Sequence, residues 1–223
     1  MLTQVTVSAP GKLMLMGEHA VVYDFPCLVT AVDSRFYLTA KVLIEPKFIL
    51  HAPDLGIIDY QKPLSQIGLG DIPDQAKCTE LAIKNFIKKY SFSRGIKIET
   101  KSSFSQKYGF GSSSASIVCT VKALGELKQL KLSNQELFDL SYQTVLEKQG
   151  VGSGFDVAAS IWGGTLYFVT AGKKIEPIKI DSIPLCIGYT GVKSNTTQIV
   201  KEIAKKKQEF PDNINKIFES ISQ

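Results

Sequence analysis

The sequence predicts an α+β fold, in which antiparallel strands are mixed with intervening helices. Two periodicities support this prediction. Apolar residues alternate with polar ones over residues 4–8, as in a half-buried strand, whereas residues 81–90 repeat them at helical spacing. Size is the third observation, because 223 residues, 44% hydrophobic and 21% charged, suffice for one large domain or two small ones.

The first half of the chain is predicted to be mostly strand. Residues 26–50 are rich in β-branched, aliphatic and aromatic side chains, and breaks at Asp33-Ser34 and Glu45-Pro46-Lys47 divide them into two or three antiparallel strands. Proline, glycine and aspartate are frequent in residues 52–75, which predicts a loop. Alternation over residues 96–100 predicts one more strand.

The second half is predicted to be mostly helical. Apolar residues after the small-residue loop 109–114 follow an i, i+4, i+7 pattern, so a helix leaves that loop. Ser133 and Glu136 have the spacing of a capping box, which predicts the start of a helix over 134–148. The other expected elements are a glycine-rich turn at 150–154 followed by a small-residue helix, strands at 165–169 and 185–190, and a helix at 196–207.

A change of composition near Ala171-Gly172-Lys173-Lys174 predicts a domain boundary. We therefore expect one domain over residues 1–171 and the start of a second over residues 172–223. The sequence shows no internal repeat.

Charge and composition exclude several classes of function. A net charge of +5 suits anionic small molecules such as nucleotides and carboxylates, but it is too small to predict a nucleic-acid partner. The longest basic run, residues 205–207, is most simply a solvated helical face. No apolar run approaches membrane-spanning length, which predicts no membrane partner.

The cysteines and histidines predict a reducing compartment and no zinc. Two histidines are too few to favour a zinc site. Widely spaced cysteines in apolar surroundings, without a C-x-x-C pair, indicate buried thiols in the cytoplasm. These cysteines are Cys27, Cys78, Cys119 and Cys186.

The first candidate motif spans residues 9–23. An apolar, strand-like run is punctuated there by proline and glycine and carries Lys12, Glu18 and His19 to one turn. A rigid apolar support that holds a few charged groups at its end is typical of a functional site.

The second motif is Gly109-Phe110-Gly111-Ser112-Ser113-Ser114-Ala115, directly ahead of a predicted helix. Glycines let the backbone approach a ligand closely, and the first amides of a helix have no intrahelical partner. With the helix dipole they form a phosphate-binding cradle, to which the serine hydroxyls add donors and a Mg²⁺ ligand. The structural alternative is a serine-rich N-cap on a packing helix. Walker, dinucleotide-binding and protein-kinase motifs are absent from the sequence.

The third motif is Gly150-Val151-Gly152-Ser153-Gly154-Phe155-Asp156-Val157-Ala158-Ala159. A carboxylate among glycines and small apolar residues needs a cation, and Lys12 is the natural candidate. The pairing would keep Asp156 ionised and able to accept a proton from a substrate hydroxyl. The alternative is that Asp156 merely caps the helix that follows.

These motifs, in this order, resemble the signatures of the GHMP small-molecule kinases. The second motif is similar to the family's G-L-G-S-S-[AS], with Phe110 in place of leucine, and the resemblance extends over residues 5–200. It implies an N-terminal domain like domain 2 of ribosomal protein S5, followed by a ferredoxin-like C-terminal domain. It also implies transfer of the ATP γ-phosphoryl group to a small molecule, with Mg²⁺.

The resemblance assigns roles by position. Asp156 matches the catalytic aspartate and Lys12 the lysine that supports it. Ser113 matches the serine that binds phosphate and Mg²⁺, and the rest of its loop binds ATP. The residues on the substrate side are Glu18, His19, Gly154 and Thr196.

The motifs divide the choice of acceptor. Residues 17–23 are most similar to the mevalonate kinase branch, which implies the 5-hydroxyl of mevalonate. Residues 150–159 look more like the phosphomevalonate kinase branch, whose substrate already carries a phosphate. Two positions depart from the mevalonate kinase pattern. Asp24 replaces a glycine, and Val145 stands where a glutamate binds Mg²⁺, which leaves Glu147, two residues on, as the candidate metal ligand.

Family members extend well beyond residue 223, through a further glycine-rich signature. We therefore expect an incomplete C-terminal domain, from a truncated frame or one completed by a partner, and its exposed apolar surface favours self-association, for example as a homodimer. A nucleotide-binding module without catalysis is the alternative of another class. Retention of both Lys12 and Asp156 favours the kinase.

Overall fold

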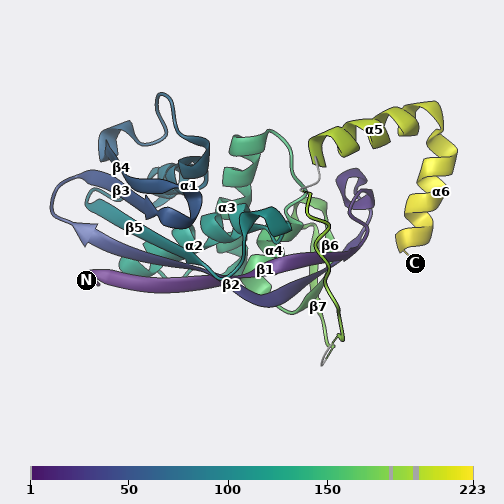
Figure 1. Ribbon diagram of the computed structural model, residues 1–223, viewed down its shortest axis with the longest axis horizontal. Helices are drawn as coiled ribbons and strands as arrows, with labels where there is room; N and C mark the ends of the chain where they lie inside the picture. Colours follow the sequence, from purple (N-terminus) through teal and green to yellow (C-terminus); the bar gives the residue numbers. More distant parts are fainter. Residues whose placement is uncertain (1, 181–182, 193–195, 223) are drawn as a thin grey trace.

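In the computed structural model, a seven-stranded mixed sheet runs through the molecule, in the order β4-β3-β5-β2-β6-β7 with β1 also paired to β2 (Figure 1). The structure describes residues 2–180, 183–192 and 196–222. The strands are β1 (Gln4–Met16), β2 (Cys27–Leu43), β3 (Lys47–Ala52), β4 (Ile57–Pro63), β5 (Gly95–Ser102), β6 (Thr165–Val169) and β7 (Lys174–Ile178). The helices are α1 (Asp74–Tyr90), α2 (Ser112–Leu127), α3 (Asn134–Gln149), α4 (Phe155–Trp162), α5 (Thr196–Glu209) and α6 (Pro211–Ser222).

Helices α2 and α4 pack on β1 and β2, and α1 and α3 pack against α2 (Figure 1). Helix α2 is almost entirely buried from Ser114 to Leu127, because it lies between the sheet and the outer helices. One apolar core therefore extends from the sheet through α2 into the helical layer. The predicted α+β class is confirmed.

Several predicted elements are confirmed with their local signals. The capping box at the start of α3 is formed, since the Ser133 hydroxyl accepts from the Glu136 amide and the Glu136 carboxylate accepts from the Ser133 amide. Strand β6 has the predicted bounds. Helix α5 begins at Thr196 as expected and runs two residues past the predicted end, to Glu209.

The predicted break at Asp33-Ser34 is wrong, because β2 is continuous from Cys27 to Leu43. In the β1–β2 ladder, Pro10 pairs with Arg35 and the next residue, Gly11, pairs with Val32. Asp33 and Ser34 are therefore the extra residues of a bulge, which interrupts the ladder without ending the strand.

The prediction of a loop over residues 52–75 is wrong, because β4 lies within it. The carboxylate of Glu80 on α1, fully buried, accepts hydrogen bonds from Tyr60 at 2.9 Å and Lys62 at 2.7 Å. The Gly68 amide also donates to it, at 2.8 Å. This distant partner fixes the segment against α1, which the local proline and glycine content could not reveal.

The sheet continues past the predicted boundary at residue 171, because β7 pairs antiparallel with β6. The strand expected at 185–190 is wrong, since these residues have no regular secondary structure. The division into domains at residue 171 stays a prediction.

The two C-terminal helices lie at one end of the molecule, beside the turn that follows β1 (Figure 1). Phe218 on α6 is buried against Tyr23 and Phe25, with ring centroids 5.4 Å and 5.5 Å away. No helix in the described part of the chain is long and apolar enough to cross a membrane.

Candidate active site

The centre of the candidate site is an ion pair between β1 and α4. The Lys12 Nζ lies 3.1 Å from the Asp156 Oδ1, with the two side chains 13% and 34% exposed. The same ammonium lies 5.0 Å from the centre of the Phe155 ring. Asp156 Oδ1 is buried and accepts no hydrogen bond from a described residue, so the Lys12 charge is its main compensation.

Lys12 also connects the first motif to the second. Its backbone amide donates to the Phe110 carbonyl at 2.9 Å, which fixes β1 beside the glycine-serine loop. Gly11 permits this approach, because a Cβ there would lie only 3.2 Å from the Phe110 carbonyl oxygen.

The glycine-serine loop ends at a helix N-terminus that carries free amides. Gly111 is the N-cap of α2 with φ 76° and no side-chain cap, and the first intrahelical bond runs from the Ala115 amide to its carbonyl. The amides of residues 112–114 therefore precede the hydrogen-bonded turns and are available to an anion. Ser112 and Ser113 are half-buried and Ser114 is buried.

The Lys12 side chain passes directly over this N-terminus. A Cβ built on Gly111 would lie 3.1 Å from the Lys12 Cγ and 3.3 Å from its Cε. The lysine therefore bridges the phosphate-loop candidate and Asp156, which brings one residue of the first motif beside the second and third motifs. Glu18 and His19 lie beyond the end of the strand that carries Lys12, so the expectation of one shared turn is wrong. Gly109, at the other end of the loop, has φ 75° and open space around it.

Aromatic side chains of α3 support the third motif. A Cβ on Gly154, which has φ 93°, would lie 3.1 Å from Phe138 and 3.0 Å from Tyr142. The Tyr142 hydroxyl donates to the Gly152 carbonyl at 2.7 Å. Glycine at position 154 thus lets the turn lie flat on these rings, and Asp156 follows in the first turn of α4, where a negative charge is favoured.

Cys27 is a neighbour of the ion pair that the sequence did not reveal. Burial raises the pKa of its thiol to about 12, and the Asp156 carboxylate adds to this shift while Lys12 opposes it. The thiol is therefore neutral and provides an uncharged surface beside the Lys12–Asp156 ion pair. Its apolar context predicted burial, but only the pairing of β2 with β1 and β6 places it here.

Glu18 is exposed and His19 half-buried in the turn after β1. His19 is the N-cap of a short 3₁₀ helix, Ala20–Tyr23, whose C-cap Asp24 has φ 67°. The position that is glycine in the mevalonate kinase pattern therefore does need a positive φ, which aspartate tolerates. The Lys173 Nζ, 2.9 Å away, holds the Asp24 carboxylate.

The metal and substrate candidates outside the three motifs gain no support from their contacts. Glu147 forms an ion pair with Lys84 and accepts from the Asn85 amide at 3.0 Å, both on α1. Its role as a metal ligand stays a prediction. Thr196 is the first residue of α5, and its side chain lies outside the described part of the structure. Within the described residues no cluster of three or more histidine, cysteine or acidic residues could hold a metal by itself.

Comparison with known proteins identifies this arrangement. Residues 76–164 match the family model described as the GHMP kinases N-terminal domain, and residues 3–42 match the galactokinase galactose-binding signature. A mevalonate kinase of Pyrococcus furiosus is 30% identical over 227 residues, which cover 99% of this chain and 67% of that protein. The chain thus spans about two thirds of the length of this relative.

Solved structures agree with the sequence relatives. The mevalonate kinase of Methanococcus jannaschii superposes with a TM-score of 0.76 at 25% identity, over 98% of this chain and 72% of that one. The Lin0012 protein of Listeria innocua gives a TM-score of 0.80 at 25% identity, over 98% and 70% of the two chains. With three family motifs meeting at the Lys12–Asp156 pair on a shared fold, the chain belongs to the GHMP kinases.

Proposed function

We propose that this kinase transfers the γ-phosphoryl group of ATP to the 5-hydroxyl of mevalonate. The observation that carries the proposal is the position of Lys12, which contacts Asp156 and passes over the N-terminus of α2. The mevalonate kinases among its relatives favour this acceptor over other small alcohols.

The proposed phosphate site is the N-terminus of α2. The free amides of residues 112–114 and the positive end of the helix dipole suit a triphosphate. The serine hydroxyls of the loop add neutral donors, and Lys12 adds a positive charge above it. Phosphoryl transfer requires mainly this kind of positioning and charge neutralisation.

Asp156 is the proposed base for the acceptor hydroxyl. Its Oδ1 lies inside the protein and its carboxylate is partly exposed, so one side faces Lys12 while the other can reach a substrate. Lys12 keeps the carboxylate ionised and stabilises charge on the phosphoryl group as it transfers. The aromatic ring of Phe155 fixes the ammonium from a further side.

The residues present fit a magnesium ion held jointly with the nucleotide. Magnesium prefers few protein oxygens together with phosphates and water. The described residues offer the Ser113 hydroxyl at the N-terminus of α2, with Glu147 as the candidate second ligand, and no preformed cluster of acids. When bound, Mg²⁺ would neutralise the phosphate oxygens.

The competing acceptor is 5-phosphomevalonate, which the third motif favours. Its phosphate would need an additional cation. Lys148 donates to the Cys78 sulfur at 3.0 Å, on the side of α1, while Lys107 is exposed just before the glycine-serine loop. Lys193 lies outside the described residues. Lys107 is therefore the better placed of the two described lysines.

The experiment is ATP turnover by the purified chain with Mg²⁺, with mevalonate and 5-phosphomevalonate offered in parallel. We expect turnover on mevalonate and a loss of about a hundredfold or more in Asp156→Asn, since a positioned base contributes at least that factor. Asp139→Asn, an exposed aspartate on α3, is the matched control and should keep full activity. Turnover on 5-phosphomevalonate alone would overturn the choice of acceptor. Nucleotide binding without turnover on either would favour a binding module.

A further inference from the structure

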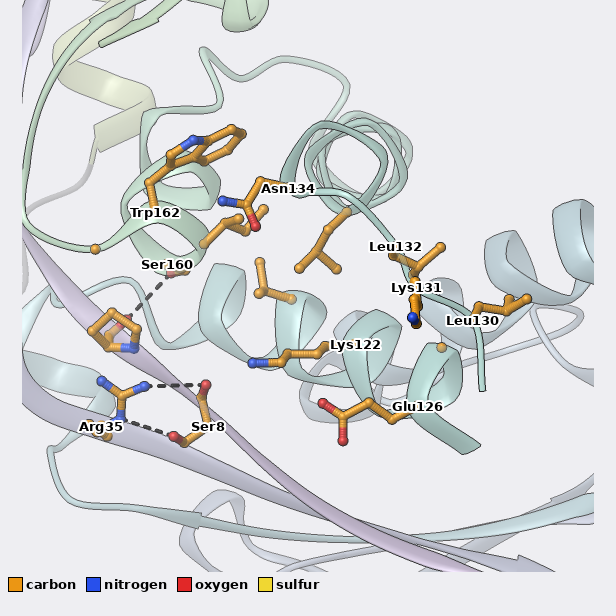
Figure 2. A pocket seen from close by; sticks show the side chains of 16 residues that line it. Ser8, Arg35, Lys122, Glu126, Leu130, Lys131, Leu132, Asn134, Ser160 and Trp162 are labelled. Atoms are coloured by element: carbon orange, nitrogen blue, oxygen red, sulfur yellow. Dashed lines mark hydrogen bonds between the residues drawn. The ribbon is translucent and has the colours of Figure 1, made fainter. Parts of the chain in front are cut away.

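A cavity lies between β1, α2, the end of α4 and the α2–α3 connection (Figure 2). Its volume is about 410 Å³, within the range of small-molecule sites. The lining does not include Lys12, Asp156 or any residue of the glycine-serine loop. Its lining reaches Pro10 on β1 and Ser160 on α4, two residues from Lys12 and four from Asp156. Along α2, the helical rise from Ser113 to Lys122 is about 13 Å, so the cations of this cavity lie well away from the glycine-serine loop.

Two cations face each other across this cavity. Two hydrogen bonds hold Arg35 against Ser8. Its Nε donates to the Ser8 hydroxyl oxygen at 2.9 Å, and its Nη2 donates to the Ser8 carbonyl oxygen at 3.3 Å. Lys122 on α2 extends across the cavity toward Arg35 and Ser8 (Figure 2). In the described part of the chain, neither cation has a carboxylate within ion-pair distance.

The arrangement of these charges favours an anion. Lys131 is the third cation in the lining, and Glu126 is its single acid. Three cations against one acid leave the lining with an excess of positive charge. An oxyanion between Arg35 and Lys122 would reduce the repulsion between these two cations. Arginine fixed in orientation is well suited to phosphate or carboxylate, because its planar donors are already aligned.

Part of the remaining cavity wall is apolar, while Asn134 and Ser160 are polar. Leu130, Leu132 and Leu137 line one part of it, and Ile161 and Trp162 line another. Trp162 is half-buried and packs edge-on against Phe138, with ring centroids 6.0 Å apart. A ligand with a charged head and a short apolar body matches this division better than a free inorganic ion.

We propose that this cavity binds a small organic phosphate, with the phosphate between Arg35 and Lys122 and the apolar body beside Trp162. This site does not depend on the identity of the kinase acceptor. It also does not depend on the nucleotide, because the glycine-serine loop is not part of its lining.

Trp162 makes the test direct, since it is the only tryptophan of the chain. We would titrate the full chain with n-hexyl phosphate and follow tryptophan fluorescence, with pyrophosphate and 1-hexanol as the head and the body alone. The expected result is a saturable change with n-hexyl phosphate at lower concentration than with either part. A saturating non-hydrolysable ATP analogue should leave this binding in place.

Variants separate the cavity from general charge effects. Lys122→Gln should raise the dissociation constant about tenfold, because it removes one charge-assisted contact, and Lys122→Arg should restore most of it. Lys101→Gln removes an exposed lysine of β5 outside the cavity and should change nothing. Absence of a saturable signal, equal affinity of Lys122→Gln and the unaltered chain, or displacement by the ATP analogue would each overturn the proposal.

Discussion

Replacing Gly111 by alanine should displace the side chain of Lys12, the proposed catalytic lysine, without removing any functional group. Gly111 and Gly109 have nearly the same backbone conformation, with φ of 76° and 75°. Alanine at either position carries the same left-handed strain, about 1–2 kcal/mol. The two variants differ only in what the new methyl group meets.

At Gly109 the methyl group meets nothing within 4 Å, whereas at Gly111 it would lie 3.1 Å from the Lys12 Cγ. Carbon atoms prefer a separation of about 3.5–4.0 Å, so the lysine must shift by roughly 0.5 Å. Catalytic groups tolerate displacements of about that size at most, and a shift of about 1 Å can reduce the rate about a hundredfold. We therefore expect kcat of Gly111→Ala to be roughly ten- to a hundredfold below that of Gly109→Ala.

The assay is ADP release with mevalonate and Mg²⁺, measured beside thermal unfolding of both variants. Equal melting temperatures with unequal kcat would show that the effect comes from the lysine and not from backbone strain. If Gly111→Ala matched Gly109→Ala in kcat at equal stability, the reasoning that Lys12 works from above this N-terminus would be refuted.

Two further predictions concern stability and reactivity. Ser133→Ala should lower the free energy of unfolding by about 1 kcal/mol at neutral pH, measured by urea denaturation. Hydrogen bonds from the Ser133 backbone and side chain lower the pKa of Glu136 below its ordinary value of 4.5. The ionised Glu136 therefore stabilises the folded protein above pH 4.5, and this stabilisation is lost as the pH falls through the folded pKa. The loss caused by Ser133→Ala should therefore shrink in acid, and a loss that grew there would contradict the assignment. In alkylation at pH 8 followed by mass spectrometry, exposed Cys186 should react first. Burial raises the pKa of Cys27 and Cys119 to about 12, so both should stay unmodified up to about pH 10 until the chain unfolds, and labelling of either in the folded protein would count against this environment.

The pairing of Lys12 with Asp156 could be predicted from the sequence because burying an unpaired carboxylate is costly. A carboxylate among small apolar residues requires a cation, and a lysine at the end of an apolar strand can supply one. The class of the fold followed from periodicity for a similar reason, since alternation and helical spacing are local properties. The roles of these residues in catalysis remain predictions.

Features that depend on distant partners were not predictable in this way. Strand β4 exists within a segment rich in turn-forming residues because Glu80, on the following helix, collects hydrogen bonds from Tyr60 and Lys62. Cys27 lies beside the ion pair only through sheet pairing. Neither contact can be predicted from the local sequence, because the partners are distant in the chain.

The bulge in β2 shows how a wrong local prediction can still mark a structural event. Asp33-Ser34 has the composition of a turn, and the chain does depart from regular pairing there, but the long ladder with β1 holds the strand together on both sides. After the bulge, Arg35 bonds to Ser8 on β1. The bulge thus precedes, by one residue, the cation at the wall of the cavity between β1 and α2. An uninterrupted strand would have kept its alternation through this position.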